Sequence, residues 1–271
     1  MSGEDIITAA EIRYKPLLED FFIKTWGSAI LYSHDIDHHR RVWKYARELL
    51  LITSPNDLPP EKLLMASYLH DIGMATDRSE RHGPAGMDLC KAFLAGNNMD
   101  IAIYSDVMEA IHNHDDKEYK NRASDRSSIL KILSAADDLD AFGFIGVYRY
   151  IEIYLARDIT PTVISSEIIR NAALRFANFE SSFWDFPSLI EKHKSRYLIL
   201  HGLMTHNTGE SDIAFINNNT RNTAASLIRL VDDMVRYKVP PSEINTLADR
   251  YPGNMIVSDF IEGILKELSE I

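Results

Sequence analysis

The sequence has a single cysteine, no long hydrophobic run and an excess of acidic over basic side chains. With Cys90 alone, an intrachain disulfide is impossible and a thiolate zinc cluster is excluded. No apolar run reaches the roughly 20 residues that a membrane-spanning helix requires. The 29 basic and 40 acidic side chains give a formal net charge of −11, which argues against binding to a nucleic acid polymer or an anionic membrane.

The features of a signal peptide are also missing. The first 15 residues, MSGEDIITAAEIRYK, contain acidic side chains and have neither a basic start nor a long apolar core. The 45% of hydrophobic and 25% of charged residues are typical of a globular protein with a substantial core. We therefore expect a soluble protein of the cytoplasm.

Alternating strand patterns and repeats are absent, whereas helical periodicity runs through most of the chain. Apolar side chains recur three and four positions apart, and turn formers such as "TSPNDLPP" separate these stretches. The expected helices are residues 17–31, 38–52, 60–71, 84–95, 100–114, 127–141, 144–156, 163–180, 187–204, 222–237 and 255–269. The sequence therefore predicts an all-α fold.

The most polar long stretch is "THNTGESDIAFINNNTRNTAA", residues 205–225. Its many turn-forming residues are typical of a loop or linker. We therefore expect a helical body over residues 1–205. Residues 206–271 would then form a C-terminal helical appendage that is packed on this body or linked to it.

A His-Asp pair follows the apolar stretch that ends at Leu69. This position predicts that His70 and Asp71 lie at least partly inside the fold. A buried carboxylate is usually paired or bound to a metal ion, and divalent ions favour imidazole nitrogen and carboxylate oxygen as ligands. Neighbours on a helix point about 100° apart, so further ligands must come from other helices.

Two other helices supply candidates of the same type. His38 precedes Val42 by four positions and lies on the apolar face, whereas His39 is expected to face solvent. Asp137 lies beside an apolar row that ends at Asp140, and a bound cation would offset the cost of acids at the end of a helix. The alternative without a metal ion is a buried His–Asp hydrogen bond and an unrelated aspartate.

Together, His38, the His70–Asp71 doublet and Asp137 resemble the H…HD…D signature of the HD-domain metal-dependent phosphohydrolases. "HDIDHHRRV" is similar to the HDxxHxxRV start of one bacterial subgroup, and "ADDLDAFGFIGVYRY" is similar to its DADxLDAxGAxGxxR segment. The resemblance covers roughly residues 30–205. It implies an HD-domain helical bundle with additional C-terminal helices, and a divalent ion (Mn, Mg, Co, Ni, Fe or Zn) held by these four residues.

The resemblance also implies a reaction, the hydrolysis of a phosphate ester or anhydride in a small phosphorylated molecule. A nucleotide is the favoured substrate, because the subgroup includes proteins that split nucleoside triphosphates into monophosphate and pyrophosphate. The HDxxED pattern of alarmone hydrolases and the GYP signature of cyclic-di-GMP phosphodiesterases are absent, and Met74 replaces the lysine of the common HDIGK variant. The alternative is a non-catalytic, metal-containing HD module that binds a nucleotide or a partner protein. A homodimer is compatible with either.

Two-metal members of the superfamily use additional histidines for a second ion or for the phosphate. At corresponding places this sequence has His82, just before a Gly-Pro helix start, and His112, late in an expected helix. His114 points elsewhere on that helix and is the weaker candidate. The alternative for each is a polar residue at a helix end. One or two ions per chain are therefore expected.

Three more residues are candidates for catalysis or substrate binding. Arg41 follows His38 by three positions and is expected either to clamp a phosphate or to pair with an acid at the surface. Asp77, in the loop after the doublet, is a candidate for orienting water, although solvated loop acids are common. Asp140 is expected at the helix end, where it would support a ligand.

Overall fold

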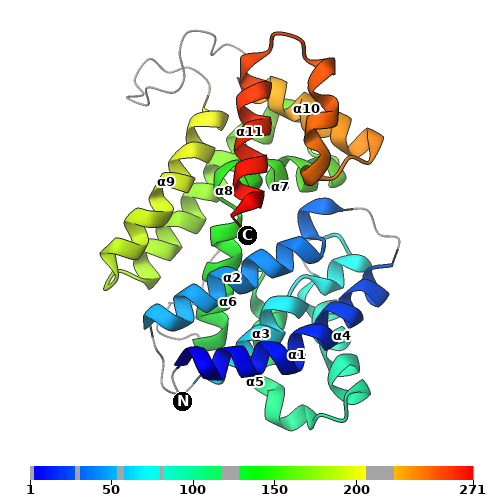
Figure 1. Ribbon diagram of the computed structural model, residues 1–271, viewed down its shortest axis with the longest axis vertical. Coiled ribbons are helices and arrows are strands. Elements are labelled where there is room, and N and C mark those ends of the chain that lie inside the picture. Colours follow the sequence, from blue (N-terminus) through cyan, green and yellow to red (C-terminus); the bar gives the residue numbers. More distant parts are fainter. Residues whose placement is uncertain are drawn as a thin grey trace. The chain divides into compact units, whose positions relative to one another are not determined.

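The computed structural model describes residues 3–27, 31–53, 58–79, 82–116, 128–205 and 223–270. The regular structure of these residues is helical and includes no strand, which confirms the predicted all-α fold (Figure 1). Within the same residues, no helix is long and apolar enough to cross a membrane. The helices are α1 (Gly3–Trp26), η1 (Tyr32–His34), α2 (Ile36–Thr53), α3 (Pro60–Leu69), η2 (Ile72–Ala75), α4 (Gly83–Gly96), η3 (Ile101–Tyr104), α5 (Ser105–Asn113), α6 (Ser128–Asp140), α7 (Gly143–Ala156), α8 (Pro161–Ser182), α9 (Pro187–Met204), α10 (Thr223–Tyr237), η6 (Pro241–Arg250) and α11 (Met255–Ser269).

Proline marks the start of several helices. Pro60, Pro161 and Pro187 stand in the first turns of α3, α8 and α9. This position suits proline because its fixed φ is helical and the first turn leaves its backbone N–H groups without helical partners anyway. Helix α1 begins earlier than expected, because a buried stripe that includes Ile7 and Tyr14 extends its apolar face toward the N-terminus.

The packing of the helices divides the chain into two compact units. The first consists of Met1–Ala29 and His34–Asp140, and the second of Ile30–Ser33 and Ala141–Ile271. This division falls between residues 140 and 141, whereas the expected one falls between residues 205 and 206. Residues 206–222, which follow the expected boundary, lie outside the described residues. Helices α10 and α11 pack with α7 in the second unit.

Helix α3 lies in the middle of the first unit. Helices α1, α2, α4, α5 and α6 all pack against it, and residues 63–69 have no exposed surface. A helix that is apolar on nearly every side can be stable only when it is enclosed in this way. Because His70 and Asp71 follow α3 directly, the chain carries both residues into the interior.

In the second unit, α7 packs against α8, α9, α10 and α11. Its first turn is capped by Glu267 of α11, whose carboxylate accepts hydrogen bonds from the backbone N–H groups of Phe144 at 3.1 Å and Ile145 at 3.0 Å. Gly143 begins α7 with a φ of +76°, and a Cβ atom there would lie 2.1 Å from Oε1 of Glu267. The positive φ favours glycine at this position, and a larger residue would also displace the Glu267 carboxylate.

Candidate metal centre

His70 and Asp71 leave the end of α3 with their side chains buried. The Nδ1–H of His70 donates to the carbonyl of Ser67 at 2.9 Å, one helical turn earlier. The last carbonyls of a helix have no partner within the helix, so this bond satisfies one of them and fixes the imidazole ring. The ring then presents Nε2 toward the Asp71 carboxylate.

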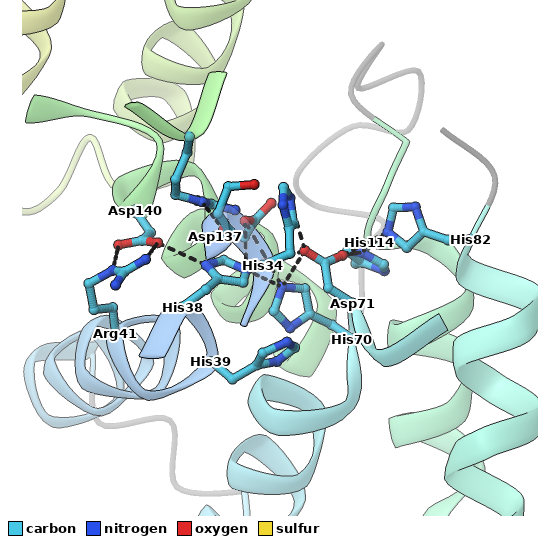
Figure 2. Close-up of polar contacts among 12 residues, drawn as sticks. His34, His38, His39, Arg41, His70, Asp71, His82, His114, Asp137 and Asp140 are labelled. Atoms are coloured by element: carbon cyan, nitrogen blue, oxygen red, sulfur yellow. Dashed lines mark hydrogen bonds and ion pairs between the residues drawn. The ribbon is translucent and has the colours of Figure 1, made fainter. Parts of the chain in front are cut away.

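Four of the expected residues lie together at this point (Figure 2). Nε2 of His70 lies 3.2 Å from Nε2 of His38 and 3.3 Å from Oδ2 of Asp71, and the same Oδ2 lies 3.2 Å from Nε2 of His38. Oδ1 of Asp137 is 3.8 Å from Nε2 of His38 and 4.0 Å from Nε2 of His70. We call His38, His70, Asp71 and Asp137 the first cluster. One donor atom from each lies within 4.8 Å of the others, and together they could hold a metal ion.

A buried ion pair holds the ring of His38 on its Nδ1 side, opposite the Nε2 atom that faces the cluster. The Nδ1–H of His38 donates to Oδ2 of Asp140 at 2.8 Å. Arg41 donates to the same carboxylate, from Nε to Oδ1 at 2.7 Å and from Nη2 to Oδ2 at 3.2 Å (Figure 2). Arg41 is only 4% exposed, so the alternative of an arginine paired at the surface is wrong, and its contact with a phosphate stays a prediction. Two of its N–H groups bind Asp140, and Asp140 in turn accepts the Nδ1–H of His38. Arg41 and Asp140 together therefore fix the orientation of the His38 ring.

A second group of histidines faces the other oxygen of Asp71. Oδ1 of Asp71 lies 2.7 Å from Nε2 of His82 and 2.8 Å from Nε2 of His114, and these two nitrogens are 3.2 Å apart. We call Asp71, His82 and His114 the second cluster, which could also hold a metal ion. The Asp71 carboxylate therefore belongs to both clusters, one oxygen to each.

The preference for His112 over His114 requires correction. His112 is exposed, whereas His114 is 2% exposed and lies in the second cluster. Helix α5 buries Val107, Ala110 and Ile111, and His114 continues this stripe one turn further. That spacing of i, i+3, i+4 and i+7 is visible in the sequence and could have identified His114.

Close backbone contacts bring His82 to Asp71. A Cβ atom on Gly73 would lie 2.4 Å from the carbonyl oxygen of His82, and one on Gly83 would lie 2.4 Å from that of His112. Only glycine allows the backbone to approach so closely at these two points. The start of α4 can therefore lie directly against the turn after Asp71 and the end of α5.

The arrangement of donor atoms fits a bound cation. In both clusters two Nε2 atoms face each other at 3.2 Å, and each of the four rings already uses its Nδ1–H for a hydrogen bond to an oxygen. Neutral rings of this tautomer direct lone pairs at one another, which is unfavourable unless a positive charge lies between them. Two ligands of one ion, about 2.0–2.2 Å from it, are about 2.8–3.6 Å apart, and the measured separations are of this size.

The charges of Asp71 and the facing histidines shift one another's pKa values. Burial raises the pKa of its carboxyl, but the facing His70 and His82 outweigh burial and hold that pKa well below its usual value. Burial lowers the pKa of His82, but the Asp71 carboxylate has the larger effect and raises that pKa to about 9. A metal ion that binds Nε2 of His82 must displace any proton held there.

Two further residues, Asp77 and His34, differ in their relation to the clusters. Asp77 is exposed, belongs to neither cluster, and accepts a hydrogen bond from the backbone N–H of Ser79 at 2.9 Å. His34 was not expected at the site, but its Nε2 lies 3.7 Å from Oδ2 of Asp71. It is the first histidine of the HDxxHxxRV pattern, which is the signal that could have identified it.

His39 is fully buried, so the expectation that it faces solvent is wrong. Helix α2 is covered on more than one side, because α1, α3 and α6 all pack on it. Burial, together with the neighbouring His70 and His38, holds the pKa of His39 well below its ordinary value, so the ring is neutral. Its Nδ1–H donates to the Ser67 carbonyl at 3.2 Å.

Comparison with known proteins gives one match to a family. The family model described as the HD domain matches residues 35–141, a segment that includes every residue of both clusters. No curated protein sequence matches this chain. Among solved structures, a protein of Lactobacillus plantarum aligns with 73% of this chain and 99% of its own, at 16% identity and a TM-score of 0.44.

Proposed function

We propose that this protein is a metal-dependent phosphohydrolase that acts on a small phosphorylated molecule, because residues 35–141 match the family model of the HD domain. HD domains are mostly metal-dependent phosphohydrolases, and the buried His/Asp clusters are of the kind that such enzymes need. A nucleotide is the favoured substrate, because of the resemblance of "ADDLDAFGFIGVYRY" to a subgroup with members that cleave nucleoside triphosphates.

The observation that carries this proposal is the shared carboxylate of Asp71. Its Oδ2 faces His38 and His70, while its Oδ1 faces His82 and His114. We propose that the first cluster holds one divalent ion and that the second cluster can hold another. A divalent ion bound there would polarise a phosphoryl oxygen and lower the pKa of a coordinated water.

The residues of the chain prepare the site for this chemistry. His38 and His70 keep Nε2 directed inward, since Asp140 and Ser67 hold their Nδ1–H groups. The net charge of −11 repels a phosphate, so the substrate depends on bound cations for its attraction. Arg41 supports this arrangement through Asp140, and no covalent enzyme intermediate is required.

The test combines metal content with activity. We would remove metal ions by chelation, reload the protein with Mn, Mg, Co, Ni or Zn, and measure phosphate and pyrophosphate release from nucleotides and phosphomonoesters. We expect hydrolysis that depends on the ion. Asp71→Asn should lose most of the bound metal, because it removes the anionic ligand common to both clusters. Asp88→Asn, at an exposed position on α4, is the matched control and should change neither property.

The number of ions is tested by His82→Ala and His114→Ala. Both should keep the first ion and lose the second, and the double variant should be hardly worse than either single one if both bind one ion. Equal metal in wild type and Asp71→Asn would contradict the assignment of the site. Metal binding without hydrolysis of any substrate would instead favour a non-catalytic binding module.

A further inference from the structure

His39 adjoins the first cluster without contributing an atom to it. Its ring centroid lies 5.0 Å from that of His70 and 5.1 Å from that of His38, which are both members of the cluster (Figure 2). Phe22 of α1 packs against the same ring at 4.5 Å. The imidazole of His39 is therefore enclosed between two expected ligands and an aromatic residue of another helix.

The backbone carbonyl of Ser67 links His39 to His70. It accepts the Nδ1–H of His70 at 2.9 Å and the Nδ1–H of His39 at 3.2 Å. A carbonyl oxygen has two lone pairs, so it can accept both bonds at once. The bond from His39 restrains the oxygen that determines the orientation of His70.

The remaining nitrogen of His39 shows that the ring is costly to bury. Its Nε2 is buried and has no hydrogen-bond partner among the described residues. An unsatisfied polar atom in the interior destabilises a fold, and an apolar ring of similar size would avoid that cost. What an apolar ring cannot supply is the donor at Nδ1, so that donor is the useful feature of His39.

We propose that His39 is a positioning residue of the first cluster: by holding the Ser67 carbonyl and packing against both rings, it fixes the direction in which His70 presents Nε2. The inference rests on the proposed function, because it assumes that the first cluster binds the ion. Partners that orient a ligating histidine commonly contribute about 10–100-fold to metal affinity.

The test compares His39→Phe with His39→Asn. Phenylalanine keeps an aromatic ring but has no donor, whereas the amide of asparagine places an N–H group near the position of Nδ1. We would titrate each metal-free protein with Co²⁺, follow its visible absorption, and record a thermal melt by circular dichroism. His39→Phe should raise the dissociation constant for Co²⁺ about 10–100-fold and alter the absorption band. His39→Asn should recover much of the affinity.

His193→Phe is the matched control, because His193 is a buried histidine of α9 in the second unit and lies outside the HD domain. It should bind Co²⁺ as the wild type does. The proposal is overturned if His39→Phe binds normally, or if the Phe and Asn variants lose affinity equally. If His39→Phe does not fold, His39→Leu takes its place in the comparison with Asn. Failure of the wild type to bind Co²⁺ would overturn the metal site itself, which keeps the two failures distinguishable.

Discussion

Three of the histidines that face Asp71 share one local geometry. The Nδ1–H groups of His70, His82 and His114 each donate to the carbonyl three residues earlier, at 2.9, 2.9 and 2.6 Å. His38 donates to Asp140 instead. With one nitrogen bound in this way, the other is fixed in both tautomer and direction. A site whose ligands are already oriented loses less conformational entropy when an ion binds.

At the residue scale, the Arg41–Asp140 pair allows a sharp prediction. Both side chains are almost fully buried, so Arg41→Ala removes one charged partner of a buried ion pair. We expect the free energy of unfolding to fall by about 3–5 kcal/mol. Urea denaturation followed by circular dichroism measures this loss.

Arg40→Ala is the control for this prediction. Arg40 is the next residue on α2 and also makes two hydrogen bonds to one carboxylate, that of Glu19, but its side chain is 39% exposed. A pair of this kind contributes about 0–1 kcal/mol. The double variant Arg41→Met/Asp140→Leu should regain stability but not metal affinity, because His38 still lacks its acceptor. An equal small loss in both arginine variants would contradict the role of the buried pair.

At the scale of elements, the site is built where helices end. His70 follows the last residue of α3, His82 precedes α4, His114 follows α5, and Asp140 is the last residue of α6. Helix ends leave backbone groups without partners, and two of these histidines, His70 and His114, donate to such carbonyls. The separate helices therefore supply both the side chains and the acceptors that orient them.

The start of α4 should control the second cluster alone. In Gly83→Ala, the new Cβ atom would lie 2.4 Å from the carbonyl oxygen of His112, so the backbone must shift. We expect His82 to move away from Asp71, the second ion to be lost and the first to remain. A misplacement of about 1 Å can reduce a rate by about 100-fold. Elemental analysis and the hydrolysis assay measure both effects.

Gly96→Ala provides the comparison at the other end of α4. A Cβ atom there meets nothing within 4 Å, so metal content and activity should stay at the wild-type level. Alanine also has the higher helix propensity, which can stabilise the helix by up to about 1 kcal/mol. Two bound ions in Gly83→Ala would show that the close contact does not position His82.

At the scale of the whole molecule, the C-terminal helix is an integral part of the second unit. Glu267 of α11 caps the first turn of α7, and Arg196 of α9 lies 3.8 Å from the same carboxylate. A Cβ atom on Gly263 would meet the ring of Phe144 at 2.5 Å, which shows how closely α11 approaches α7. Residues far apart in the sequence therefore complete one core.

Removal of the cap should loosen the start of α7. Glu267→Ala deprives the N–H groups of Phe144 and Ile145 of a charged acceptor, which should cost about 1–3 kcal/mol. Hydrogen–deuterium exchange should show faster exchange in this turn. Glu262→Ala, at an exposed position on the same helix, should leave exchange unchanged. Unaltered exchange in Glu267→Ala would mean that α11 does not hold α7 in this way.

The sequence by itself determined the helical fold class, the match of residues 35–141 to the HD-domain family model, and the grouping of His38, His70, Asp71 and Asp137. These follow from local patterns: the period of apolar residues along one helix, and the order and spacing of a motif. Their binding of a metal ion stays a prediction, as do the substrate and the number of ions.

Only the tertiary structure decided which side of each helix is enclosed. His39 and Arg41 lie on faces of α2 that other helices cover. One helix can be covered by two or three neighbours, and its own periodicity does not say how many. The contacts between helix ends, and hence the second cluster, depend on that packing.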